Sequence, residues 1–218
     1  MSRCICAVFY SCLLLLVCLI VLHGAPIVER WDLAMLKGVQ RVAGPGLDDV
    51  ALFMAVVGGP FFSLLFIGGL SIAYWRRRWV RAMFLFWGLF VLLTGFEVLS
   101  KTQIDHPRPP EELKRKVQIT GLLRKLPDVT IPTNNSFPSG HCLRAVFLMG
   151  ILVMFVRSGK RAMDVSVTMV AVAYGIVACW SRIYLGVHWP SDVMAGWLIG
   201  AAISFVIFKI ATESESKK

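Results

Sequence analysis

Six long apolar runs constrain the fold of this chain more than any other feature of its sequence. They lie near residues 5–22, 50–75, 82–100, 139–156, 165–180 and 193–208. With 57% hydrophobic residues and a mean hydropathy of +0.70, the chain is too apolar for a soluble domain. Lipid offers no partner to a free backbone amide, so each run must be helical. We therefore predict an all-α fold, in which residues 1–218 form one membrane-embedded domain, an integral membrane six-transmembrane-helix bundle.

Several local features refine this prediction. The region 22–25 lacks the paired small residues of a cleavage site, so we interpret the first run as a span rather than a signal peptide. Residues 29–40 predict a short amphipathic helix at the interface, with Trp31 as its anchor. Pro60 should kink the second span. The six cysteines are irregularly spaced, and we interpret them as small hydrophobic residues rather than a disulfide framework.

The basic residues predict the orientation of the bundle. The net charge of +10 resides mainly in short links between apolar runs, which is typical of topology signals and lipid contacts and argues against nucleic-acid binding. The links 76–81 and 157–161 share one side with both termini, and the positive-inside rule makes that side cytoplasmic. The segments 23–49, 101–138 and 181–192 then face the extracytoplasmic side of a plasma (inner) membrane. The 101–138 link is also basic, but it is longer, and its charge can serve a ligand.

The link between the last two spans carries three ionisable residues, Arg182, His188 and Asp192. An ionisable group drawn to the bilayer centre costs about 2.5–3.5 kcal/mol, so three of them at a membrane edge need a reason. We predict that this link is half of an active site.

Two further polar clusters fall on the same predicted membrane face. Lys101 and Arg108 follow the third span, and Ser139, Gly140 and His141 begin the fourth. Cations in excess around a pocket imply an anionic ligand, and the planar fork of arginine matches phosphate. The start of a helix adds free amides, and a glycine there lets backbone approach the ligand. The sequence therefore predicts a phosphate-binding site.

The two histidines suggest a reaction at phosphorus, in which one attacks and the other protonates the leaving oxygen. Pro190 should open the last helix and place Asp192 in its first turn, where the carboxylate can fix the tautomer of His188. The sequence offers no cluster of carboxylates for a metal, so the cations would have to supply that stabilisation, and we expect no metal and no cofactor.

These residues together resemble a three-part family signature. The parts are Lys101-x6-Arg108-Pro109, then Pro138-Ser139-Gly140-His141, then Ser181-Arg182-x5-His188-x3-Asp192. All three are complete and in order, and the pattern is similar to that of the type 2 phosphatidic acid phosphatase superfamily. The resemblance implies a six-helix, metal-independent lipid phosphatase.

The resemblance also assigns roles. It implies that His188 is the nucleophile and forms a phosphohistidine, that Asp192 orients it, and that His141 is the general acid. The phosphoryl oxygens would be held by the residues at the matching positions, Lys101, Arg108, Ser139, Gly140 and Arg182.

The substrate expected from the family is a membrane lipid phosphate in the bilayer. The candidates are isoprenyl (undecaprenyl) diphosphate, phosphatidylglycerol phosphate and phosphatidic acid. Recycling of the cell-envelope lipid carrier is our first choice, and no obligate protein partner is inferred. The alternatives are a lipid phosphotransferase that uses the same phosphohistidine, and a non-enzymatic anion transporter, which predicts charges spread through the depth of the bundle.

Three residues near the motifs have more than one interpretation. Arg144 lies one turn beyond His141, where it either pairs with Glu97 or contacts the second phosphate of a diphosphate substrate. Glu97 stands four residues before Lys101, which favours an i,i+4 ion pair, and a role in substrate binding is the alternative. We interpret His106 as a surface residue, and a contact with the substrate is the alternative.

Overall fold

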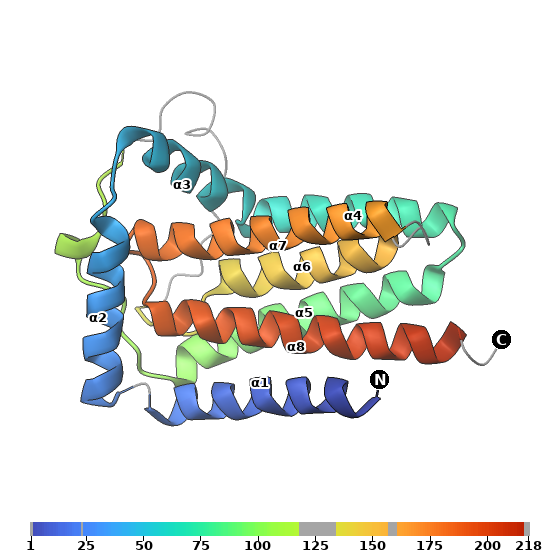
Figure 1. Cartoon of the computed structure of the whole chain (residues 1–218), viewed down its shortest axis with the longest axis horizontal. Coiled ribbons are helices and arrows are strands. Elements are labelled where there is room, and N and C mark those ends of the chain that lie inside the picture. The colour runs from blue at the N-terminus through green and yellow to red at the C-terminus, as the bar shows by residue number, and fades with distance from the viewer. Residues whose placement is uncertain (1, 23, 118–133, 157–160, 216–218) are drawn as a thin grey trace.

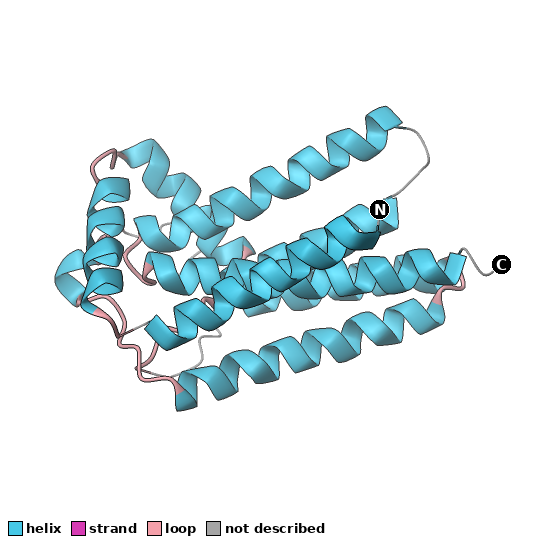
Figure 2. Ribbon diagram, turned by 60° about the horizontal axis from the view of Figure 1, so that its bottom comes forward, coloured by secondary structure: helices cyan, strands magenta, loops and turns pink. Residues whose placement is uncertain are grey.

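The computed structural model contains only helices, turns and loops among the residues it describes, which are 2–22, 24–117, 134–156 and 161–215 (Figure 2). The α-helices are α1 (Ser2–Leu22), α2 (Pro26–Gln40), α3 (Pro45–Val57), α4 (Pro60–Arg76), α5 (Val80–Gln103), α6 (Gly140–Val156), α7 (Arg161–Tyr184) and α8 (Pro190–Glu215). A 3-10 turn, Glu111–Leu113, follows α5. The predicted all-α class is confirmed.

The helices account for the predicted spans in three ways. α5 and α8 and most of α7 are long and apolar enough to cross a membrane as single helices. α1 with α2, and α3 with α4, pass the same test as bent pairs, and α6 is a shorter apolar helix. The result agrees with a bundle of about six membrane segments.

The second predicted span is broken rather than merely kinked. α3 and α4 meet at an angle of 60°, with Gly58 and Gly59 between them. Pro60 is the first residue of α4, where its missing N–H removes no helical hydrogen bond. The sequence located the break but not its size, and this bend carries α3 away from α4 toward the end of the bundle that holds α2 (Figure 1).

α2 lies across one end of the bundle (Figure 1). It begins at Pro26, three residues before the predicted start, and leaves Trp31 partly exposed. Asp32 is 2% exposed, and its carboxylate accepts hydrogen bonds from Ser191 N (2.8 Å) and Ser191 Oγ (2.6 Å). α2 therefore caps the N-terminus of α8 through a buried carboxylate.

α6 occupies the middle of the bundle and packs closely on α8. A Cβ on Gly196 would lie 2.4 Å from Ser139 O, and one on Gly200 would lie 2.7 Å from Leu143 O. The two glycines thus let the backbones of α8 and α6 approach. The glycine pair on α8 therefore serves close packing inside the bundle.

The polar links gather at one end. α2, the segment after α5 and the α7–α8 link lie together, whereas the start of α1 and the end of α8 lie at the opposite end (Figure 1). This arrangement matches the predicted grouping of the links. Residues 157–160 of the second basic link and residues 118–133 of the basic 101–138 link, including Arg124 and Lys125, lie outside the described residues.

Candidate active site

The short link between α7 and α8 positions the first group of site residues. Gly186 has a φ of +67°, a left-handed conformation that favours glycine, and a Cβ there would lie 2.2 Å from Leu113 O. Arg115 N donates to Leu185 O at 3.1 Å. The 3-10 turn after α5 is therefore packed against the α7–α8 link. Only a glycine at position 186 leaves room for this contact.

Asp192 lies in the first turn of α8, as predicted, and is fully buried. Its Oδ2 accepts from Trp189 N at 2.9 Å and lies 3.3 Å from His188 Nδ1. Because a carboxylate only accepts, the bond assigns the ring hydrogen of His188 to Nδ1 and leaves the lone pair on Nε2. His188 is thus held in the tautomer suited to nucleophilic attack through Nε2.

The second motif is attached directly to the third. Ser139 N donates to Asp192 O at 3.0 Å, so this amide is already used and is not the free anion-binding group that we expected. Ser139 Oγ is buried and has no nitrogen or oxygen partner among the described residues. The hydroxyl, rather than the amide, is the group that Ser139 has available for a ligand.

A buried ion-pair cluster lies against Gly140. Glu97 accepts from Lys101 Nζ at 2.7 Å through Oε1 and forms an ion pair with Arg144 through Oε2. A Cβ on Gly140 would lie 1.9 Å from Glu97 Oε1. The space left by the glycine is therefore filled by a carboxylate of α5, and the predicted i,i+4 pair of Glu97 with Lys101 is confirmed. Arg144 takes the first of its two interpretations, pairing with Glu97.

His141 contacts the break between α3 and α4. Its Nε2 lies 3.1 Å from Ala55 O, a carbonyl that only accepts, so Nε2 carries a hydrogen and Nδ1 is the nitrogen that can exchange a proton. A Cβ on Gly58 would lie 3.2 Å from His141 Cδ2. The glycine at the break thus makes room for the ring.

The cations surround the pair of histidines. Burial, with help from the charges of Lys101 and Arg182, lowers the pKa of His188 below its usual value, against the opposing effect of Asp192. Arg182 and His188 also lie close enough to His141 to act on its charge. The structure therefore brings together His188, Asp192, His141, Lys101 and Arg182 from four helices and a link.

Arg108 lies in the loop after α5, which runs beside the α7–α8 link. Its backbone N donates to Asn134 O at 3.3 Å, and the carbonyl of the preceding Pro107 accepts from Trp189 Nε1 at 2.8 Å. Arg108 Nε is buried and has no hydrogen-bond partner among the described residues. A buried guanidinium nitrogen without a partner is costly and suits an anionic ligand.

His106 is the residue for which the sequence interpretation was wrong. It is buried rather than on the surface, and its Nδ1 lies 2.9 Å from Asp192 Oδ1. Its position within the first motif, two residues before Arg108, was the only signal of a link to the site.

The arrangement suits chemistry on an anion. It offers a histidine with a free Nε2 lone pair, a second histidine with an exchangeable proton, and several buried cations. Across the described ranges, no three His, Cys, Asp or Glu side chains are grouped to hold a metal ion. The fold is that of a helical membrane protein, and buried cations and two histidines gather at one end of its bundle.

The chain belongs to the PAP2 superfamily, whose sequence profile matches residues 82–216. It is 37% identical over 87 residues to an undecaprenyl-diphosphatase of Sulfolobus acidocaldarius, a match that covers 40% of this chain and 39% of that protein. It is 26% identical to phosphatidylglycerophosphatase B of Bacillus subtilis, over 83% of each chain.

The fold is shared with a solved structure. The crystal structure of a transmembrane PAP2-type phosphatidylglycerolphosphate phosphatase from Bacillus subtilis matches with a TM-score of 0.79 at 21% identity. The match covers 94% of this chain and 96% of that one. The predicted family and its membrane-embedded helical fold are thereby confirmed.

Proposed function

We propose that this protein is a metal-independent membrane lipid phosphatase that hydrolyses a phosphate or diphosphate lipid through a phosphohistidine on His188. The observation that carries the proposal is the buried Asp192–His188 pair at 3.3 Å, set among Lys101, Arg182 and His141. The names of the relatives support a phosphatase of lipid phosphates.

The first step forms the phosphoenzyme. His188 Nε2 donates its lone pair to phosphorus, so that a P–N bond forms and the bond from phosphorus to the leaving oxygen breaks. His141 gives its proton to that oxygen. Asp192 keeps the hydrogen bond to Nδ1 and stabilises the positive charge that the ring of His188 acquires.

The second step returns the enzyme. Neutral His141 takes a proton from water, whose oxygen attacks phosphorus, and the P–N bond breaks with its electron pair returning to His188 Nε2. Inorganic phosphate leaves. For a diphosphate lipid the products are phosphate and the lipid monophosphate.

The phosphoryl oxygens need positive and donor groups in both steps. Lys101, Arg108 and Arg182 supply charge, Ser139 supplies its hydroxyl, and Gly140 contributes the N-terminus of α6. These groups lie in a buried site, where electrostatic stabilisation is stronger than in water. Arg108 Nε, which is buried and has no hydrogen-bond partner in the described part of the chain, supports this role.

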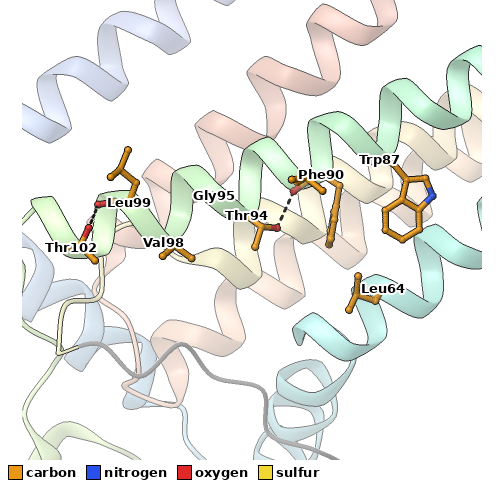
Figure 3. A pocket seen from close by; sticks show the side chains of 9 residues that line it. Leu64, Trp87, Phe90, Thr94, Gly95, Val98, Leu99 and Thr102 are labelled. Carbon is orange, nitrogen blue, oxygen red and sulfur yellow. Dashed lines mark hydrogen bonds between the residues drawn. The ribbon is translucent and has the colours of Figure 1, made fainter.

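An apolar groove supports a lipid substrate that enters sideways from the bilayer. The groove has a volume of about 540 Å³ and lies between α4 and α5. Figure 3 shows its lining side chains along α5, from Trp87 to Thr102, with Leu64 facing them from α4. The last lining residue, Thr102, follows Lys101 at the end of α5. An acyl or prenyl tail in the groove would therefore place the phosphate at the end of the bundle that holds the cations.

The substrates that follow from the names of the relatives are undecaprenyl diphosphate and phosphatidylglycerol phosphate, with phosphatidic acid as a third candidate. We favour the isoprenyl diphosphate and a role in recycling the cell-envelope lipid carrier. The site would face the extracytoplasmic side of the plasma membrane.

The position of the buried charges supports an enzyme over an anion transporter. Among the described residues, the buried charged side chains of α5 to α8 lie near one end of the bundle, on the last two turns of α5, the last turn of α7, the first two turns of α6 and the first turn of α8. A transport path would need such groups through the depth of the bundle.

Phosphate release by the purified protein in detergent tests the proposal. With EDTA present, we expect turnover of at least one of the three lipids, and a loss of about 10⁴-fold or more in His188→Ala. Arg76→Ala, an exposed cation at the other end of the bundle, is the matched control and should keep full activity. Loss of activity on chelation, or no release from any of the lipids, would contradict the proposal.

The same assay separates hydrolysis from phosphotransfer. An added lipid alcohol competes with water for the phosphohistidine only in a transferase. We expect free phosphate as the main product, whereas a phosphorylated acceptor as the main product would replace the hydrolase with the transferase.

A further inference from the structure

Asp192 is shared between two histidines, one on each carboxylate oxygen. Oδ2 serves His188, and Oδ1 lies 2.9 Å from His106 Nδ1, which is the shorter of the two contacts. Asp192 is 0% exposed and His106 is 7% exposed, so water does not compete for either contact. A third donor, Trp189 N, completes the set on Oδ2.

His106 is itself held in place. Its carbonyl accepts from Ser136 N at 2.9 Å and from Ser136 Oγ at 3.0 Å, and its ring meets the ring of Phe137 edge-on at 6.1 Å. Because Asp192 can only accept, the contact assigns a hydrogen to His106 Nδ1. The donor is thus both oriented and assigned by its surroundings.

The charges around His106 favour its protonated form. Burial opposes that form, but Asp192, and Asp32 and Glu29 on α2, outweigh burial and raise the pKa of His106 above its usual value. The opposite holds for His188, where burial and the nearby cations lower the pKa. One carboxylate therefore lies between a histidine that favours a proton and one that favours its loss.

We infer that His106 is a positioning residue of phosphoryl transfer, which holds Asp192 against His188 by donating from its own Nδ1 to the second carboxylate oxygen. The inference rests on the proposed function of the site. It concerns a residue at an unspecified position of the first motif, between Lys101 and Arg108, and His106 itself touches neither the phosphorus nor the leaving oxygen in this scheme.

Two consequences follow for His188. The bond to Oδ1 fixes the rotation of the carboxylate, and so the direction of Oδ2. The positive charge of His106 also offsets part of the charge of Asp192, which keeps His188 neutral and ready to attack at lower pH. Loss of His106 removes both effects.

Three substitutions separate the bond from the charge. The amide nitrogen of asparagine takes the place of Nδ1, whereas that of glutamine reaches the place of Nε2. We expect His106→Ala and His106→Gln to lower kcat by about 10- to 100-fold, the scale for loss of a group that orients a reactive residue from behind. KM should change little, and His106→Asn should recover most of kcat.

The pH profile provides a readout that packing alone would not move. kcat/KM should fall as the pH drops through the pKa of His188, because only the neutral ring attacks. His106 is protonated there, since its pKa is raised and that of His188 is lowered. All three variants lack its charge, so Asp192 acts fully on His188 and the acid limb should move up by about one pH unit, with Lys101, Arg182 and His141 unchanged.

The outcomes distinguish this inference from the proposed function. Wild-type phosphate release that His188→Ala abolishes supports the function whatever His106 does. Wild-type kcat in His106→Ala would overturn the inference, as would equal losses in all three variants or an unshifted acid limb. Thermal unfolding checks that each variant folds, and inhibition by inorganic phosphate checks that its anion site is intact. If His106→Ala does not fold, the comparison of His106→Asn with His106→Gln tests the inference instead.

Discussion

The space that a side chain would fill at Gly140 is occupied by a carboxylate from another helix. Glu97 reaches this position from α5 and is held there by Lys101 and Arg144. The glycine therefore does more than expose backbone to a ligand, since it fixes the site of a counter-ion that in turn orients two cations.

This contact makes a specific prediction for Gly140→Ala. The new Cβ would lie 1.9 Å from Glu97 Oε1, so the carboxylate must move and Lys101 loses its orientation. We expect kcat/KM to fall by about 100-fold, as for a misplacement of about 1 Å in a site of this kind. Adding Glu97→Asp shortens the side chain by one methylene and should restore part of the loss, and a double variant no better than Gly140→Ala would contradict this account.

Arg144 provides a second test at the scale of single residues. Because it pairs with Glu97, its removal should act through Glu97 and Lys101 and affect every substrate alike. We expect Arg144→Ala to lower kcat/KM by a similar factor for a monophosphate and a diphosphate lipid. A clearly larger loss with the diphosphate would instead assign Arg144 to the second phosphate.

The sequence predicted the residues of the three motifs and the pair of Lys101 with Glu97, but not the contacts that Asp192 and Gly140 make with other elements. Arg182, His188 and Asp192 stand out because they are ionisable residues in a short link between apolar runs. His106 does not, because a histidine in a polar loop is typical of a surface, and only the fold brings it to Asp192. The Glu97–Gly140 contact likewise joins residues of different helices that no spacing relates.

The break between α3 and α4 is the element that supports His141. Ala55 at the end of α3 supplies the carbonyl that fixes the ring, and Gly58 leaves space beside it. Pro60 indicates the position of this break in the sequence. The 60° bend, however, depends on how α3 packs on α7 and how α4 packs on α6, and the periodicity of the sequence does not reveal this packing.

Gly58→Ala tests this role of the break. Its Cβ would lie 3.0 Å from Met54 O and 3.2 Å from His141 Cδ2, so the ring must shift. We expect kcat to fall by about 10-fold or more, within the range that general acid catalysis contributes, with little change in KM. Gly69→Ala on α4 has open space, and activity should be kept while helix stability rises by up to about 1 kcal/mol. Equal kcat in the two variants would contradict the role.

At the scale of the whole molecule, the bundle has one polar, site-bearing end and one end where α1 begins and α8 ends (Figure 1). The order of the membrane segments follows from the apolar runs, because length and hydropathy decide it, but the division of the second run into α3 and α4 does not. The crossing of α2 over the site end does not, since it depends on the buried contact between Asp32 and Ser191.

The proposed orientation predicts which end an impermeant reagent reaches. In a background without the native cysteines, Glu112→Cys in the 3-10 turn should react with an impermeant maleimide on intact cells. Arg76→Cys at the opposite end should react only after permeabilisation. The reverse pattern would place the site in the cytoplasm.

The central claim is that His188 takes the phosphoryl group, and trapping of the phosphoenzyme tests it most directly. Substrate labelled in the terminal phosphate is mixed with the enzyme and quenched in base, and the labelled peptide is mapped by mass spectrometry. We predict an acid-labile, base-stable phosphoryl group on His188 that His188→Ala lacks. Turnover by wild type with no phosphoenzyme, or with the phosphoryl group on another residue, would contradict the account.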